Sequence, residues 1–321
     1  MRHNEPLVMG RAKALRATLL GVGLAAALGC HSVPGAGPAP EAEVAPLARH
    51  DTQLQAELEA ATSDFRGVVG VWVQHLQSGR FAALRADEVF PTASMIKVPI
   101  LCALYARIDA GELDPHAKLV YDKARLYPGE DLLGSFEDGQ AIALDKLVML
   151  MLSMSDNTAS LWLQELAGTG TAINAWLDAH GFVGTRMNSR TPGRERDRER
   201  MGWGQTTPRE MAELLVAIRS GRAASPASCE EMHRALTRSF WNKEALSAIP
   251  PDIAVMSKQG AVNRSRSEVL LVHARHGDYV LCVITKEQAD ESWGHDNEGF
   301  ALLRALSRLV FEHFEGARPN D

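Results

Sequence analysis

The stretch Thr92-Ala93-Ser94-Met95-Ile96-Lys97-Val98-Pro99 is the most informative part of this chain. An extended segment here gives way to an apolar helical one, which places Ser94 and Lys97 on one helix face, about 5 to 6 Å apart at Cβ. A serine hydroxyl is a poor nucleophile until a neighbour takes its proton, and a lysine can do so when burial or a nearby cation lowers its pKa. The pair is therefore a candidate nucleophile and base. The same spacing also occurs in ordinary solvated helical pairs, so only other residues of the chain can show whether this pair is catalytic.

Two further polar clusters lie at places where secondary structure changes. Ser155-Asp156-Asn157 stands between two helical stretches, where it also suits a simple helix N-cap. Ser257-Lys258-Gln259-Gly260-Ala261 follows a predicted strand. A glycine there allows a substrate to approach the strand closely, and Lys258 supplies a positive charge. Taken alone, this cluster is equally typical of a solvated strand end.

The hydrophobic pattern predicts strands at both ends of the chain and helices between them. Strands are expected at 67–73, 80–84, 253–257, 268–274 and 279–285, and helices at 52–64, 96–113, 144–152, 158–166, 171–180, 208–218 and 299–314. Thr207-Pro208-Arg209-Glu210 fits a capping box with proline in the first turn. We expect an α+β fold, with an antiparallel sheet of about five strands formed by both chain ends, flanking helices and an inserted all-α subdomain. The junction of two such parts is a natural cleft.

The first 50 residues differ from the rest. Four basic residues precede the apolar run 17–28, which is too short to span a bilayer and ends at Gly29-Cys30, so residues 1–30 are predicted to be a signal peptide. Cys30 resembles a bacterial lipoprotein cleavage site; ordinary signal cleavage or an uncleaved anchor are the alternatives. Residues 31–50 are rich in Pro and Gly and predict a tether, followed by one domain at 51–321. We expect an exported protein, periplasmic or tethered to a membrane only through this lipid.

Charge and cysteine content exclude several classes of function. Loss of residues 1–29, with four basic residues and one acidic residue, changes the formal charge from −6 to −9, which argues against nucleic acid as a partner. Besides Cys30 there are only Cys102, Cys229 and Cys282, and no Cys-x-x-Cys or His-Glu-x-x-His pattern occurs. We therefore expect no disulfide framework, no metal and no cofactor, and a protein that acts as a monomer.

The three polar clusters, in this order and spacing, resemble those of the serine β-lactamase and penicillin-binding-protein superfamily, closest to class A β-lactamases. The resemblance covers roughly residues 50–316. It implies that Ser94 is the acylated nucleophile and that Lys97 accepts or relays its proton. It further implies that Ser155 protonates the leaving nitrogen, with its pKa lowered by Lys258, and that Asn157 holds the substrate amide. The backbone N–H groups of Ser94 and Ala261, next to Gly260, would form the oxyanion hole.

The chain departs from the family in its third cluster. Gln259 stands where Thr or Ser is usual; its amide can donate a hydrogen bond to a carboxylate, but it is longer and reaches a different point. The residue Gln259 therefore leaves open how a substrate carboxylate is recognised. Arg266, eight residues after Lys258, is a candidate auxiliary cation or, equally, a solvated strand arginine.

The second departure concerns hydrolysis of the acyl-enzyme. The resemblance implies a loop glutamate that activates water, but the alignment of residues 185–193 puts Thr191 at that position, and a threonine is no base at neutral pH. Either deacylation is slow or another carboxylate acts. Glu195 is the candidate general base; the alternative is that the alternating charges of residues 194–200 pair with one another in a solvated loop.

These observations leave three hypotheses. The first is a β-lactamase-type serine hydrolase, acylated on Ser94, which hydrolyses β-lactam amides, with slow deacylation. The second is a DD-peptidase-like enzyme that acts on peptidoglycan stem peptides. The third is a penicillin sensor or binding module that does not hydrolyse its ligand. The partners expected are thus small-molecule β-lactams or stem peptides.

Overall fold

The structure is a computed structural model that describes residues 47–129, 131–237 and 239–316. The predicted signal peptide, Cys30 and most of the predicted tether lie outside the described residues. Within the described ranges, no helix is long and apolar enough to cross a membrane.

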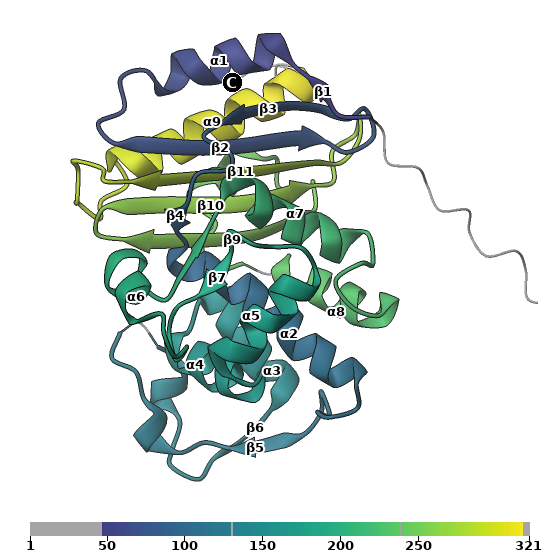
Figure 1. The fold of residues 1–321 in the computed structure, drawn as a ribbon, viewed down its shortest axis with the longest axis vertical. Coiled ribbons are helices and arrows are strands. Elements are labelled where there is room, and N and C mark those ends of the chain that lie inside the picture. Colours follow the sequence, from purple (N-terminus) through teal and green to yellow (C-terminus); the bar gives the residue numbers. More distant parts are fainter. Residues whose placement is uncertain (1–46, 130, 238, 317–321) are drawn as a thin grey trace, which may run out of the picture. The chain divides into compact units, whose positions relative to one another are not determined.

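A six-stranded sheet is built from the two ends of the domain, and the expected α+β class is confirmed (Figure 1). Its strands lie in the order β1 (Arg49–His50), β3 (Arg80–Leu84), β2 (Val68–His75), β11 (Tyr279–Lys286), β10 (Ser265–Val272) and β9 (Val255–Val262). All neighbours are antiparallel except β1 and β3, which are parallel. The additional strand, β1, uses two residues that the sequence analysis assigned to the tether.

Helices cover both faces of this sheet because alternate strand side chains point to opposite faces. On one face α1 (Thr52–Thr62) and α9 (Glu298–Glu315) pack against a cluster that includes Val71, Leu270 and Leu281. On the other face α7 (Pro208–Arg219) packs against a cluster that includes Trp72 and Val280. Both layers are apolar and buried, so the sheet is a rigid base for the edge strand β9.

The helical insert lies beyond β9, at the edge of the sheet opposite β1 (Figure 1). It contains α2 (Lys97–Asp109), α3 (Leu144–Met149), α4 (Asn157–Leu166), α5 (Thr169–Ala179), α6 (Glu195–Met201) and α8 (Pro226–Leu236). The expectation of an all-α insert is wrong, because the strands β4 (Phe90–Pro91), β8 (Gly204–Thr206) and β7 (Arg186–Met187) form a small sheet, and β5 (Lys118–Val120) pairs with β6 (Ala141–Ala143). Helices α6 and α8 were not predicted.

The predicted capping box at α7 forms only in part. The side chain of Thr207 accepts a hydrogen bond from the Glu210 N–H at 3.2 Å, as expected of an N-cap. The Glu210 carboxylate, however, accepts N–H groups of the loop before β7, among them that of Thr185 at 2.6 Å. The glutamate therefore ties this loop to α7 instead of capping its own helix.

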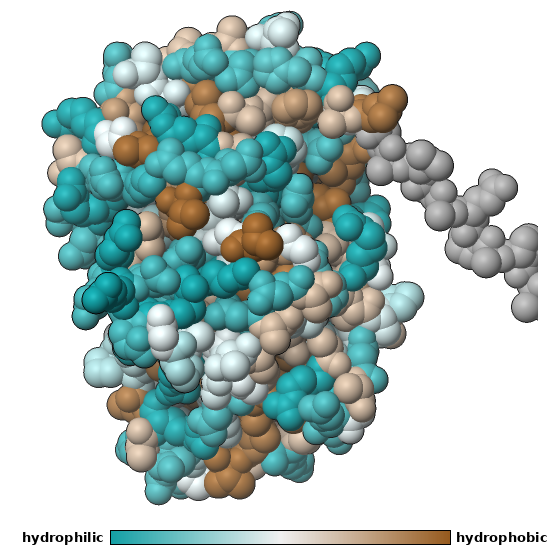
Figure 2. Space-filling model, viewed as in Figure 1, coloured by the Kyte–Doolittle hydropathy of each residue, from teal (hydrophilic) through white to brown (hydrophobic). Residues whose placement is uncertain are grey.

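The surface seen in Figure 2 is mainly hydrophilic, with separate hydrophobic spots rather than one broad apolar band.

Cys102, Cys229 and Cys282 are free thiols in the interior.

Candidate active site

Ser94 and Lys97 are brought together by a tight turn that precedes α2. Residues Ala93–Ile96 form a single 3₁₀ turn, η1, and α2 begins at Lys97. The sequence analysis expected an α-helix here. In a 3₁₀ turn, side chains three residues apart lie directly above one another. The Lys97 Nζ atom accordingly lies 3.0 Å from Ser94 Oγ.

Lys97 is completely buried and its amine has four oxygen neighbours. Besides Ser94 Oγ, Nζ lies 2.6 Å from the carbonyl oxygen of Ser155, 2.9 Å from Ser155 Oγ and 2.9 Å from Asn157 Oδ1. Ser155 reaches this position because it follows a π-helical turn, η4 (Leu150–Met154), and adopts a left-handed conformation with φ of 59°. This conformation is unfavourable for a serine and turns both of its oxygens toward the amine.

Lys258 completes the cluster from the sheet side. It extends from β9 and is almost fully buried. Its Nζ atom donates to Ser155 Oγ at 3.1 Å and to the Gln259 carbonyl at 2.9 Å. The Ser155 hydroxyl thus bridges the two amines, and a proton can pass between Ser94, Lys97 and Ser155 over hydrogen-bond distances.

The environment of the two amines lowers the pKa of both. Burial first, and the charge of Lys258 second, hold the pKa of Lys97 well below its ordinary value, against the opposing charges of Asp156 and Asp131. Burial lowers the pKa of Lys258 to about 7. Burial and the neighbouring Asp131 raise the pKa of Asp156 to about 7. At acidic pH this buried carboxyl is therefore neutral and no longer raises the pKa of Lys97.

The edge strand β9 touches η1 at a glycine. A Cβ atom on Gly260 would lie 2.9 Å from the Ser94 nitrogen and 2.7 Å from the Thr92 carbonyl oxygen, closer than real Cβ contacts allow. Only glycine therefore lets the strand approach the nucleophile. Ala261 follows directly, at an edge that no other strand of the sheet covers.

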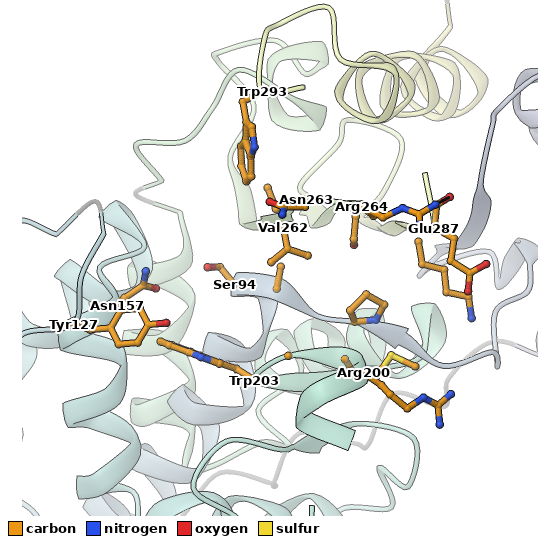
Figure 3. A pocket seen from close by; sticks show the side chains of 17 residues that line it. Ser94, Tyr127, Asn157, Arg200, Trp203, Val262, Asn263, Arg264, Glu287 and Trp293 are labelled. Atoms are coloured by element: carbon orange, nitrogen blue, oxygen red, sulfur yellow. Dashed lines mark hydrogen bonds between the residues drawn. The ribbon is translucent and has the colours of Figure 1, made fainter. Parts of the chain in front are cut away.

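Two cavities meet at Ser94. The larger, about 860 Å³, runs between Tyr127 and Trp203 on one side and residues 261–265 on the other (Figure 3). The smaller, about 620 Å³, is lined by Ser155 and Gln259. Ser94, Asn157, Ala261 and Trp293 line both cavities, whereas Gly260 lines only the smaller one. The structure thus places Ser94, Asn157 and residues 259–261 where a substrate can reach them.

The structure does not place Thr191 or Glu195 at this site. Thr191 Oγ1 donates to the carbonyls of Met187 and Ser189, at 3.0 and 3.1 Å. Glu195, at the start of α6, is exposed and accepts the Gly193 N–H at 3.1 Å. Neither residue lines either of these two cavities. The expectation that Glu195 is positioned as a general base is therefore not met: its helix turns only its last residues toward the cavity.

Both interpretations of Arg266 are wrong. The residue is fully buried, so it is no solvated strand arginine, and it lines neither cavity, so it offers no cation to a ligand. Its guanidinium donates to the Ser292 carbonyl at 2.6 Å and to the Ser265 carbonyl at 3.0 Å. It points to the face of the sheet that α9 covers.

Sequence reasoning missed three aromatic residues of the site: Tyr127, Trp203 and Trp293. All three lie in loops or turns, where no hydrophobic period marks an orientation. It also missed Glu268, a fully buried carboxyl on β10 opposite Gln259. Within the described ranges, no cluster of three or more His, Cys, Asp or Glu side chains is arranged to hold a metal ion.

Comparisons with known proteins agree with this geometry. The family model described as "Beta-lactamase enzyme family" matches residues 53–314. A mutant of PBP-A, solved as an acyl-enzyme complex with penicillin G, is 25% identical, covers 84% of this chain and 98% of its own, and has a TM-score of 0.74. A β-lactamase from Sphaerobacter thermophilus DSM 20745 is 25% identical over 84% of this chain and 99% of its own, with a TM-score of 0.73. An ancestral class A β-lactamase is 27% identical over 82% and 100%, with a TM-score of 0.71.

Proposed function

Since the chain belongs to the β-lactamase enzyme family, we propose that it is a serine hydrolase that is acylated on Ser94 by β-lactam amides. The observation that carries the proposal is the Lys97 amine, which is buried, held at a low pKa and 3.0 Å from Ser94 Oγ. A neutral amine at this distance can accept the Ser94 proton as the hydroxyl oxygen attacks the carbonyl carbon. A solvated, charged lysine cannot.

The remaining residues complete acyl transfer. The backbone N–H groups of Ser94 and Ala261 stabilise the oxyanion, and each such donor is typically worth about 3 to 4 kcal/mol. Ser155 passes a proton to the leaving nitrogen, since its hydroxyl lies within hydrogen-bond distance of both Lys97 and Lys258. Asn157 binds the substrate amide. Ser155 lines only the smaller cavity, so the leaving group occupies that cavity and the acyl group the larger one.

Hydrolysis of the acyl-enzyme is slow under this proposal. Among the described residues that line the cavities, the only carboxylates are Glu244 and Glu287. Glu244 is buried and paired with Arg304, and Glu287 is an exposed residue of the larger cavity. Neither lies within hydrogen-bond distance of Ser94 or Lys97, where a water-activating base must act.

Intact-mass spectrometry after mixing with benzylpenicillin tests acylation and deacylation separately. We expect an adduct on Ser94 that persists for minutes and is absent in Ser94→Ala. No adduct on the folded wild-type protein would refute the proposal. Clearance within seconds would refute only slow deacylation. Nitrocefin turnover then measures hydrolysis directly. A stable adduct with no turnover fits a penicillin sensor or a DD-peptidase-like enzyme, and cleavage of a D-Ala-D-Ala peptide separates these two.

A DD-peptidase-like activity is the second candidate, and the size of the larger cavity favours it. About 860 Å³ beside an uncovered strand edge can hold an extended peptide, which adds its backbone to the sheet as an extra strand. Release of D-alanine from a peptide that ends in D-Ala-D-Ala, lost in Ser94→Ala, would establish this activity.

Export and lipid attachment are also part of the proposal. A basic segment followed by an apolar run that ends at Gly29-Cys30 supports them. Metabolic labelling with a fatty acid should mark the wild-type protein and not Cys30→Ala; labelling of both would exclude Cys30 as the anchor.

A further inference from the structure

Trp293 stands where the two cavities meet. It lines both of them, although 59% of its surface is exposed. Figure 3 shows it on the opposite side of Ser94 from Tyr127 and Trp203. Those two rings support each other in an edge-to-face contact with centroids 5.1 Å apart. A large exposed aromatic side chain at a cavity mouth is a feature of ligand-binding surfaces.

Arg266 lies beneath this tryptophan. Its guanidinium carbon is 4.5 Å from the centroid of the Trp293 ring and 4.7 Å from that of Phe300, so the flat cation has aromatic rings for neighbours. Its hydrogen bond to Ser292 holds the backbone just before Trp293. A buried arginine is costly unless its donors are satisfied. Here Nη2 donates to the Ser292 carbonyl beside the tryptophan and Nη1 to the carbonyls of Val262 and Ser265, while Nε has no partner among the described residues.

A second side chain fixes the same loop. Asn297, the N-cap of α9, donates to the carbonyls of Asp290 and Ser292, at 3.1 and 2.9 Å. The Asn297 N–H also donates to the Gly294 carbonyl at 3.1 Å, so the backbone that carries the exposed Trp293 ring is held on both sides of it. A surface aromatic without a ligand has no need of such support, whereas a binding platform gains affinity from being ordered before the ligand arrives.

We propose that Trp293 is a specificity-determining platform, which favours acyl donors with a flat apolar group beside the scissile carbonyl, and that Arg266 positions the Trp293 ring. This inference rests on the proposed acylation of Ser94. An aromatic ring on the acyl group lies in the larger cavity, against the exposed part of the indole. Arg266 lines neither cavity and positions the ring through its hydrogen bond to Ser292 and its contact with the indole.

Two probes that differ in one group test the platform. Benzylpenicillin carries a phenylacetyl group, and 6-aminopenicillanic acid has the same bicyclic ring system without it. We expect Trp293→Ala to lower the ratio of their second-order acylation rate constants, benzylpenicillin over 6-aminopenicillanic acid, about tenfold. Phe240→Ala is the matched control, because Phe240 is 60% exposed and lines neither cavity. An unchanged ratio in Trp293→Ala, or an equal fall in both variants, would overturn the proposal.

A binding measurement separates this inference from the proposed function. In a Ser94→Ala background no adduct can form, so calorimetry reports non-covalent affinity for benzylpenicillin. We expect affinity to fall about tenfold when Trp293→Ala is added. If the wild-type protein is not acylated but this fall is found, the platform stands and the proposed chemistry fails. If affinity is unchanged, the platform is wrong whatever the chemistry.

Arg266→Lys tests the positioning role, since it keeps the charge but loses the planar fork. We expect a smaller fall in the same ratio, and no further fall when it is combined with Trp293→Ala, because both act through one contact. Circular dichroism and the melting temperature show whether each variant folds. If the two substitutions lower the ratio additively in the double variant, or if Arg266→Lys slows acylation by both probes equally, Arg266 has only a structural role.

Discussion

Glu268 makes the stability of this fold depend on pH in a direction that can be predicted. It extends from β10, directly opposite Gln259, and is 1% exposed. Its Oε2 atom accepts the Ala245 N–H at 2.7 Å, while Oε1 has no hydrogen-bond partner in the described part of the chain. Burial is the main cause that raises the pKa of this carboxyl from its ordinary 4.5 to about 8. That value already includes the attraction of Lys258.

The sign and size of the effect follow from proton linkage. The folded state holds the Glu268 proton more tightly than the unfolded state, so the stability that this group contributes is complete below about pH 4.5 and is lost as the pH rises to about 8. A move of the pKa over this range is worth roughly 5 kcal/mol, at about 1.4 kcal/mol per pH unit. Between pH 5 and pH 9 the loss is about 4 kcal/mol.

Glu268→Gln removes the charge and keeps an oxygen for the Ala245 N–H. We expect urea unfolding to give similar free energies for the two proteins at pH 5, and a variant that is more stable by up to about 4 kcal/mol at pH 9. The difference between variant and wild type cancels the titrating groups that do not interact with Glu268; Lys258, whose pKa the Glu268 carboxylate raises, is the exception. Glu199→Gln, an exposed residue of α6, is the control and should show no such trend. A difference for Glu268→Gln that is the same at both pH values would refute the reasoning.

Three further predictions concern the acylation site. In Lys258→Gln the pH at which stopped-flow acylation is half-maximal should rise, because the charge of Lys258 lowers the pKa of Lys97; a lower or unchanged midpoint would contradict this. Thr191→Glu should speed adduct clearance less than about twofold, since that side chain points to backbone carbonyls away from the cavities; tenfold faster clearance, measured by mass spectrometry, would show that the loop reaches the acyl group. Gly260→Ala should slow acylation roughly 10- to 100-fold and cost about 1 to 3 kcal/mol in urea unfolding, because its Cβ would press on Ser94; wild-type rates would show that β9 can move aside.

The sequence predicts the contact between the first serine and the first lysine of the site, because their spacing depends on local structure alone. Ser94 and Lys97 are three residues apart, and any helical turn brings them onto one face. The β-hairpin and the helices with strong periods, such as α7 and α9, appear close to their expected positions. The residue types of the three clusters indicate the chemistry, and the tertiary fold brings the three clusters together.

The direction of a side chain on a strand or loop could not be predicted, because it depends on register and tertiary packing. Arg266 was placed before an expected strand at 268–274, but β10 begins at Ser265, so the residue lies inside the sheet and faces α9. The strand starts three residues earlier than expected, so an arginine assigned to an exposed strand end lies within the sheet, on the same face as Leu270. The expected position of Glu195 was missed because α6 was not predicted. A helix, unlike an open loop, fixes which of its residues face the cavity.

The hydrogen bonds of Lys97 give a physical reason for slow hydrolysis that is independent of the missing loop carboxylate. A neutral amine has two N–H donors and one lone pair. If the lone pair faces the Ser94 hydroxyl, the two donors already have three oxygens within 2.9 Å, two of them from Ser155 and one from Asn157. Acylation of Ser94 removes the hydroxyl proton that faced the lone pair, so the lone pair is the one position of the amine that a water molecule can use. Such a water must lie between Lys97 and the acyl carbon, in the place that the Ser94 proton has left, and this single narrow position slows hydrolysis.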